Sequence, residues 1–139
     1  MVKTAVLYRK TSHINHNLRR LKAKQTVSEV EFLANADIRD SVLLNLQQAI
    51  QGCIDIGTHI VSDENWGVPG SFSDIFYKLE EHEIIPTSLV ESLIKMVGFR
   101  NLIVHQYEDI DFKIVYQIYQ NRVKDIEDFL DAVQSHFAP

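Results

Sequence analysis

Apolar residues recur at three- and four-residue steps through most of the chain, the spacing that places side chains on one face of an α-helix. This pattern predicts four main helices: residues 2–24, a helix that Asp37 caps, a helix with Pro86 as its first residue, and about 27 residues that Asp111 caps. No strand-like alternation of polar and apolar residues competes with these helices. We therefore expect an all-α fold.

Two shorter helices are predicted between the main ones. Thr26, followed three residues later by Glu29, resembles a capping box and should begin a helix that ends near Asn35. Ser71 or Ser73 can cap a second one, after the Gly/Pro-rich loop at residues 63–70. The sequence thus predicts a single domain, residues 1–139, built as a bundle of four main helices with one or two short ones.

The composition is that of an ordinary soluble domain, with 45% hydrophobic and 24% charged residues in 139. The one cysteine, Cys53, excludes an intrachain disulfide and falls within an apolar stripe, so we expect it in the core. No apolar stretch approaches the roughly 18 residues of a membrane span, and no cleavable leader is recognised. A cytoplasmic protein is expected, with no contact to a membrane.

Charge is divided unevenly along the chain. Residues 1–28 hold seven Lys or Arg and no acid, whereas residues 29–139 hold seven bases against nineteen acids. The basic residues, Lys3, Arg9, Lys10, Arg19, Arg20, Lys22 and Lys24, could face the phosphates of a nucleic acid. Alternatively, the first helix lies against acidic neighbours such as Glu127, Asp128 and Asp131.

The candidate chemistry lies at the end of the helix that begins at Pro86. Arg100, Asn101, His105 and Tyr107 follow an apolar stripe there, and Arg100 and His105 are about 140° apart on a continuous helix. These two side chains could converge if the helix frays near Val104, or if two copies of the segment meet across a two-fold axis. Otherwise Arg100 pairs with a carboxylate and His105 is an ordinary helix-end histidine.

The spacing of Arg100, His105 and Tyr107 resembles the Arg-x4-His-x-Tyr motif of the HEPN superfamily, and its setting in residues 96–111 resembles the HepT branch. Residues 40–47, 53–60 and 67–69 are also similar to that family, so the likeness covers nearly all of the chain after Ile38.

The resemblance implies a HEPN-type bundle that acts as a homodimeric, metal-independent endoribonuclease toxin of the type VII class, with RNA as substrate and a composite site at the dimer cleft. Arg100 and His105 would be catalytic, without a cofactor. It also implies an MntA-like nucleotidyltransferase antitoxin that adds AMP to Tyr107. Asn101 could orient His105, or could simply face solvent.

Several further expectations follow from the residues themselves. The six histidines show no metal-ligand spacing, so no structural metal is expected. Trp66 either packs over the end of the bundle or is exposed to a partner, and Gly57 and Gly98 should mark close helix approach, for Gly98 at a dimer seam. The helix with Met96, Phe99 and Ile103 is expected to form that seam with the last helix. The alternative function is a helical binding module without nuclease activity that regulates a nucleotidyltransferase.

Overall fold

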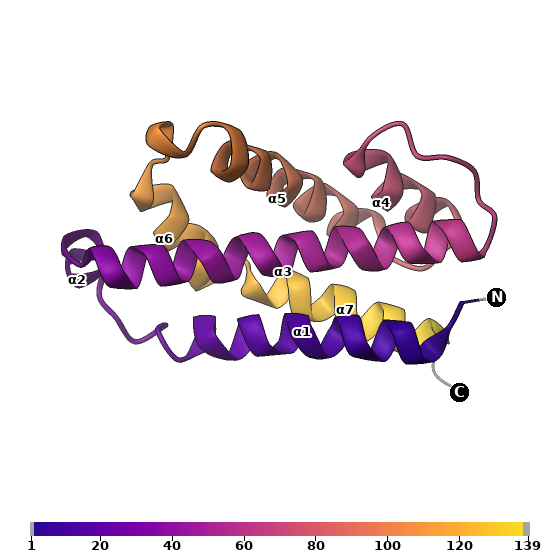
Figure 1. The fold of residues 1–139 in the computed structure, drawn as a ribbon, viewed down its shortest axis with the longest axis horizontal. Helices are drawn as coiled ribbons and strands as arrows, with labels where there is room; N and C mark the ends of the chain where they lie inside the picture. The colour runs from indigo at the N-terminus through magenta and orange to yellow at the C-terminus, as the bar shows by residue number, and fades with distance from the viewer. Residues whose placement is uncertain (1, 138–139) are drawn as a thin grey trace.

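Helix α3 (Ala36–Asp63) is the element on which the other long helices pack (Figure 1). In the computed structural model, which describes residues 2–137, α1 and α5 lie on opposite sides of α3, and α7 lies below α3 and partly behind α1. The other elements are α1 (Thr4–Lys22), α2 (Glu29–Ala34), α4 (Phe72–Glu81), α5 (Thr87–His105), the 3₁₀ turn η1 (Tyr107–Asp109), α6 (Phe112–Asn121) and α7 (Val123–Phe137). Residues 2–137 contain no strand, which confirms the all-α fold. Residues 1, 138 and 139 of the predicted domain lie outside the described residues.

The helix starts differ from the predicted caps at two places. Ser28, not Thr26, caps α2, and its side chain accepts a hydrogen bond from the Glu31 N–H at 3.2 Å. Asn35, not Asp37, caps α3, because the Asn35 Oδ1 accepts from the N–H of Ile38 at 3.1 Å. In both cases a good N-cap residue stands two positions away from the predicted one, so the pattern fixed the helix but not its first turn.

Three other helices begin at or next to the predicted residue. Ser71 caps α4, Asp111 caps α6, and Pro86 is the N-cap of α5 rather than its first residue, a difference of one position.

The predicted final helix of about 27 residues is wrong, because it is interrupted at Arg122 and forms α6 and α7. The Tyr119 carbonyl, which a continuous helix would pair with the N–H of Val123, accepts instead from the side chain of Gln25 at 3.1 Å. Gln120 donates in return to the Gln25 carbonyl at 3.0 Å. The loop after α1 thus holds the end of α6 and turns the chain there.

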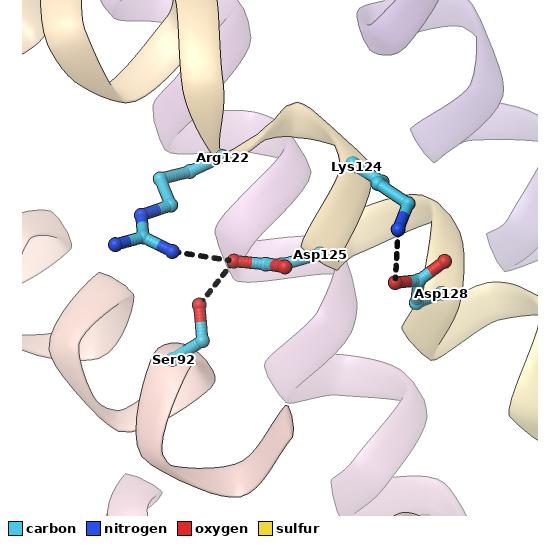
Figure 2. Close-up of polar contacts among 5 residues, drawn as sticks. All are labelled: Ser92, Arg122, Lys124, Asp125 and Asp128. Carbon is cyan, nitrogen blue, oxygen red and sulfur yellow. Dashed lines mark hydrogen bonds and ion pairs between the residues drawn. The ribbon is translucent and has the colours of Figure 1, made fainter. Parts of the chain in front are cut away.

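A hydrogen bond joins the start of α7 to α5, and two ion pairs lie beside it within the start of α7 (Figure 2). Asp125 lies in the first turn of α7, where a negative charge is favourable, and accepts a hydrogen bond from Ser92 of α5. Arg122 lies 3.7 Å from the same carboxylate, and Lys124 lies 3.9 Å from Asp128. The junction is thereby fixed relative to the helix that carries the candidate site.

Helix α1 joins α3 through a buried polar contact as well as apolar packing. Helix α1 buries one apolar side, formed by Leu7, Ile14, Leu18 and Leu21. Between them, the Asn17 amide donates to Asn45 at 3.2 Å and to Gln48 at 2.8 Å, both on α3. Buried amides carry a free-energy cost unless they are paired, so this contact specifies how α1 sits on α3.

The interior of the bundle also contains Cys53 and Gly57 of α3, as predicted. Burial raises the pKa of the Cys53 thiol above its ordinary value, which keeps the sulfur protonated and unreactive. A Cβ at Gly57 would lie 2.5 Å from the Cγ2 of Ile75, so glycine is what lets α4 approach α3 this closely.

Candidate active site

Arg100 lies in the last turns of α5 and keeps an uncompensated positive charge. Its Nε donates to the Gln51 side-chain oxygen at 3.0 Å and its Nη1 to that of Asn101, also at 3.0 Å. The guanidinium also lies 5.3 Å from the centre of the Phe72 ring. Within residues 2–137 it forms no ion pair with a carboxylate, so the pairing considered as an alternative is wrong. Two neutral amides orient this charge without cancelling it.

Gln51 of α3 fixes the position of Arg100 and is itself held in place. Its amide nitrogen donates to the Asp55 carboxylate at 2.9 Å, while its oxygen accepts from Arg100. Asn101 likewise bonds to Arg100, so its amide orients the arginine in this structure, where the sequence had suggested His105. Gln51 has no place in the Arg-x4-His-x-Tyr spacing, and no signal in the sequence pointed to it.

His105 is the last residue of α5 and is exposed to solvent. The helix continues without fraying at Val104, so Arg100 and His105 remain about 140° apart around it. The fraying that could have brought them together is therefore not observed. In a single chain the arginine faces α3 while the histidine faces outward.

Tyr107 follows α5 in the short turn η1 and contacts α3 as well. Its hydroxyl donates to the Asp40 carboxylate at 3.3 Å. The negative charge of Asp40 is the main reason that the pKa of Tyr107 is raised, with smaller effects from desolvation and from this hydrogen bond, and Arg39 opposes the shift. The phenol therefore stays protonated at neutral pH.

Arg100 and Tyr107 are seven residues apart, a spacing that would place both on one face of a continuous helix, but α5 ends at His105. The two side chains nevertheless bind the same side of α3. Their partners Gln51 and Asp40 are eleven residues apart, which is about 20° around a helix and about 16 Å along it.

Exposure alone does not distinguish Tyr107 from the other tyrosines. Its exposed fraction is 52%, while Tyr77 is 51% and Tyr8 is 77% exposed; Tyr119 is fully buried. Tyr77 of α4 is thus as open to solvent as Tyr107. What distinguishes Tyr107 is its position just beyond His105 and its bond to Asp40.

The outward face of α5 is formed by residues other than those expected at a dimer seam. Met96, Phe99 and Ile103 are buried within their own chain. Gly98, Leu102 and His105 are exposed instead and lie within about 60° of one another around the helix. No heavy atom lies within 4 Å of a Cβ built at Gly98, so this glycine makes no close approach inside the chain.

Other surface features lie away from these residues. A groove of about 360 Å³ between α5 and α6 is lined in part by Ser92 and Arg122 and includes none of Arg100, His105 and Tyr107. Trp66 is half-buried and stacks on His82 with ring centres 3.7 Å apart, so it packs over the end of the bundle.

Across residues 2–137, no three His, Cys, Asp or Glu side chains are grouped so that they could ligate a metal. None of the helices in that range combines the length and apolarity of a membrane span.

A family model, two relatives compared by sequence and a solved structure compared by fold all match this chain to one family of proteins. The family model described as Ribonuclease HepT-like matches residues 14–133. The mRNA nuclease HepT of Shewanella oneidensis is 37% identical over 105 residues, which cover 76% of this chain and 79% of that protein. The tRNA nuclease HepT of Aphanizomenon flos-aquae is 30% identical over 98 residues, covering 70% and 67%. A solved structure of a tri-AMPylated HEPN toxin of Shewanella oneidensis in complex with MNT antitoxin superposes with a TM-score of 0.87 and 32% identity, covering 94% of this chain and 97% of that one.

Proposed function

Since the chain belongs to the HepT-like ribonuclease family, we propose that it is an RNA endonuclease that works without a metal ion and is the toxin of a toxin–antitoxin pair. The observation that carries this proposal is the state of Arg100, a permanently charged guanidinium that neutral amides orient and that pairs with no carboxylate of residues 2–137. A guanidinium held in this way can donate two parallel hydrogen bonds to the oxygens of a bound phosphate.

The chemistry assigns complementary roles to Arg100 and His105. The ribose 2′-oxygen attacks the phosphorus, the bond to the 5′-oxygen breaks, and a 2′,3′-cyclic phosphate remains on the upstream fragment. The 2′-hydroxyl loses a proton and the leaving 5′-oxygen gains one, transfers that histidine performs near neutral pH. Negative charge grows on the non-bridging phosphate oxygens, and the Arg100 guanidinium can donate to two of them. Asn101 and Gln51 act as positioning residues by holding that guanidinium.

A second copy of the chain completes this site. One α5 helix presents Arg100 and His105 about 140° apart, and a second copy of the chain would add its own histidine to the site. In a two-fold dimer built on the outward face of α5, the two His105 side chains approach the axis and provide both an acid and a base. The small Gly98 and the apolar Leu102 fit such an isologous contact.

Cleavage in the presence of EDTA tests this function directly. The purified chain should cut single-stranded RNA in excess EDTA and leave 2′,3′-cyclic phosphate ends, which mass spectrometry of the fragments identifies. Cleavage that requires a divalent ion would contradict the mechanism. The absence of any cleavage, with no growth arrest when the chain is expressed alone, would favour the regulatory binding module instead.

We expect Leu102→Glu to abolish both dimerisation and cleavage. The Leu102 side chain is 46% exposed, so a carboxylate there is tolerated by the monomer but places two like charges at a two-fold contact. Light scattering should give a monomer, circular dichroism an unchanged helix content, and the cleavage rate should fall at least about 10²-fold with the loss of the shared acid and base. Val30→Glu is the matched control, since that valine is 80% exposed on α2. A dimeric and active Leu102→Glu variant would exclude this seam.

The same reasoning assigns the regulation of the toxin to Tyr107. Its protonated phenol lies just past His105, is half exposed, and is held by Asp40. We propose that an MntA-like nucleotidyltransferase antitoxin attaches AMP to this oxygen. Each AMP adds bulk and negative charge next to the cleft and thereby repels the RNA phosphates. The S. oneidensis relative, whose solved structure is that of a tri-AMPylated toxin with its antitoxin, supports this proposal.

A further inference from the structure

We propose that a strip of basic and histidine side chains on α1 binds the RNA strand outside the scissile phosphate, an inference that rests on the proposed nuclease function. The strip consists of Arg9, His13, His16 and Arg20. All four side chains are exposed. They are spaced at i, i+4, i+7 and i+11, which places them within about 60° of one another and along about 16 Å of the helix.

The charges of this strip are not used inside the protein. Within residues 2–137 neither Arg9 nor Arg20 forms an ion pair. Of the seven bases in the first 28 residues, Lys22 alone pairs with an acid there, at 2.9 Å from Glu127 of α7. Lys22 lies on the side of α1 away from the strip. The alternative that the basic helix simply faces acidic neighbours therefore accounts for Lys22 and leaves the strip unexplained.

The strip and Arg100 border one continuous surface. Asn17, next to the strip on α1, donates to Gln48 of α3, and one turn further along α3 Gln51 accepts from Arg100. Only α3 thus lies between α1 and Arg100, and the axes of neighbouring packed helices are about 8–10 Å apart. Figure 1 shows α3 between α1 and α5 along their whole length.

Exposed side chains of α3 form the surface between the strip and Arg100. Leu44, Gln48 and Asp55 are exposed there, and the Asp55 carboxylate is engaged by Gln51. A few nucleotides suffice to span this distance, so an RNA chain cut at Arg100 reaches the strip. Phosphate contacts of this kind supply affinity that does not depend on base sequence. The family match begins at residue 14, so part of the strip lies outside the shared region.

The experiment compares two double variants that each remove two positive charges. Arg9→Gln/Arg20→Gln removes two charges from the strip. Lys22→Gln/Lys124→Gln removes two charges elsewhere, next to Glu127 and Asp128. The probe is a fluorescein-labelled 2′-O-methyl RNA, which lacks the attacking hydroxyl and cannot be cut. We expect the strip variant to bind about 10-fold more weakly and its slope of log K against log salt to be shallower by about 1.4, the value for two phosphates of a single strand. The control variant should change neither quantity.

Cleavage kinetics separate this inference from the proposed function. On a long RNA the strip variant should show a raised KM with kcat unchanged, and on a dinucleotide both constants should equal those of the unsubstituted protein. Equal RNA binding by the two double variants would overturn the inference while leaving the nuclease in place. Unchanged RNA binding with weakened capture of the nucleotidyltransferase would assign the strip to a protein partner instead. If the unsubstituted chain cuts no RNA, the proposed function fails whatever the binding assay gives.

Discussion

Arg100→Ala should lower the rate of RNA cleavage by about 10²–10³-fold, the cost of removing one preorganised donor to developing charge. Arg100→Lys should recover only part of this loss, because an ammonium keeps the charge but cannot donate to two phosphate oxygens in a planar arrangement. Asn101→Ala should have a smaller effect, since it removes one of the two amides that hold the guanidinium. The measurement is single-turnover cleavage of a defined RNA in EDTA.

His105→Ala should reduce the same rate by about 10²–10⁴-fold, because it removes the proton-transfer group from both subunits at once. The His105 side chain is exposed at the end of α5, so its loss should leave the thermal unfolding midpoint nearly unchanged. The matched control is His136→Ala on α7, an exposed histidine away from the motif. Cleavage that persists in both Arg100→Ala and His105→Ala would show that other groups perform the chemistry.

Helical periodicity was enough to predict the fold class because each main helix buries one continuous apolar face. The end of α6 shows the limit of that information. Residues 112–137 keep a helical period throughout, yet the side chain of Gln25, far away in the sequence, donates to the Tyr119 carbonyl that a continuous helix would pair with Val123. The pattern of neighbouring residues does not reveal when a side chain far away in the sequence competes for a backbone carbonyl.

The sequence predicted the motif residues of the candidate site but not the residues that hold them. The Arg-x4-His-x-Tyr spacing picks out Arg100, His105 and Tyr107, but it does not contain their partners on α3. Gln51 and Asp40 become visible only when α5 is packed on α3. The residues expected at the dimer seam show the same limit. Helical periodicity alone does not tell whether an apolar side chain such as Phe99 packs in its own core or against a second chain.

Tyr107→Phe should leave the nuclease active and free it from silencing by the nucleotidyltransferase. The substitution removes an exposed hydroxyl whose one hydrogen bond, to Asp40, is 3.3 Å long, so the folded structure should be little affected. It also removes the oxygen that would attack the α-phosphorus of a nucleoside triphosphate. No O–P bond can then form, no pyrophosphate is released, and the cleft stays open to RNA.

Co-expression with an MntA-like nucleotidyltransferase provides the measurement. The unsubstituted chain should gain the mass of one or more AMP units on the peptide that contains Tyr107 and should lose RNA cleavage, whereas Tyr107→Phe should gain no mass, keep its cleavage rate and arrest growth. Tyr77→Phe and Tyr8→Phe are the matched controls, because those phenols are at least about as exposed as that of Tyr107 yet lie away from His105, and both variants should still be silenced. If a variant without the Tyr107 hydroxyl is silenced as completely as the original chain, the switch lies elsewhere, since bulk and charge added next to the cleft can act only where they are attached.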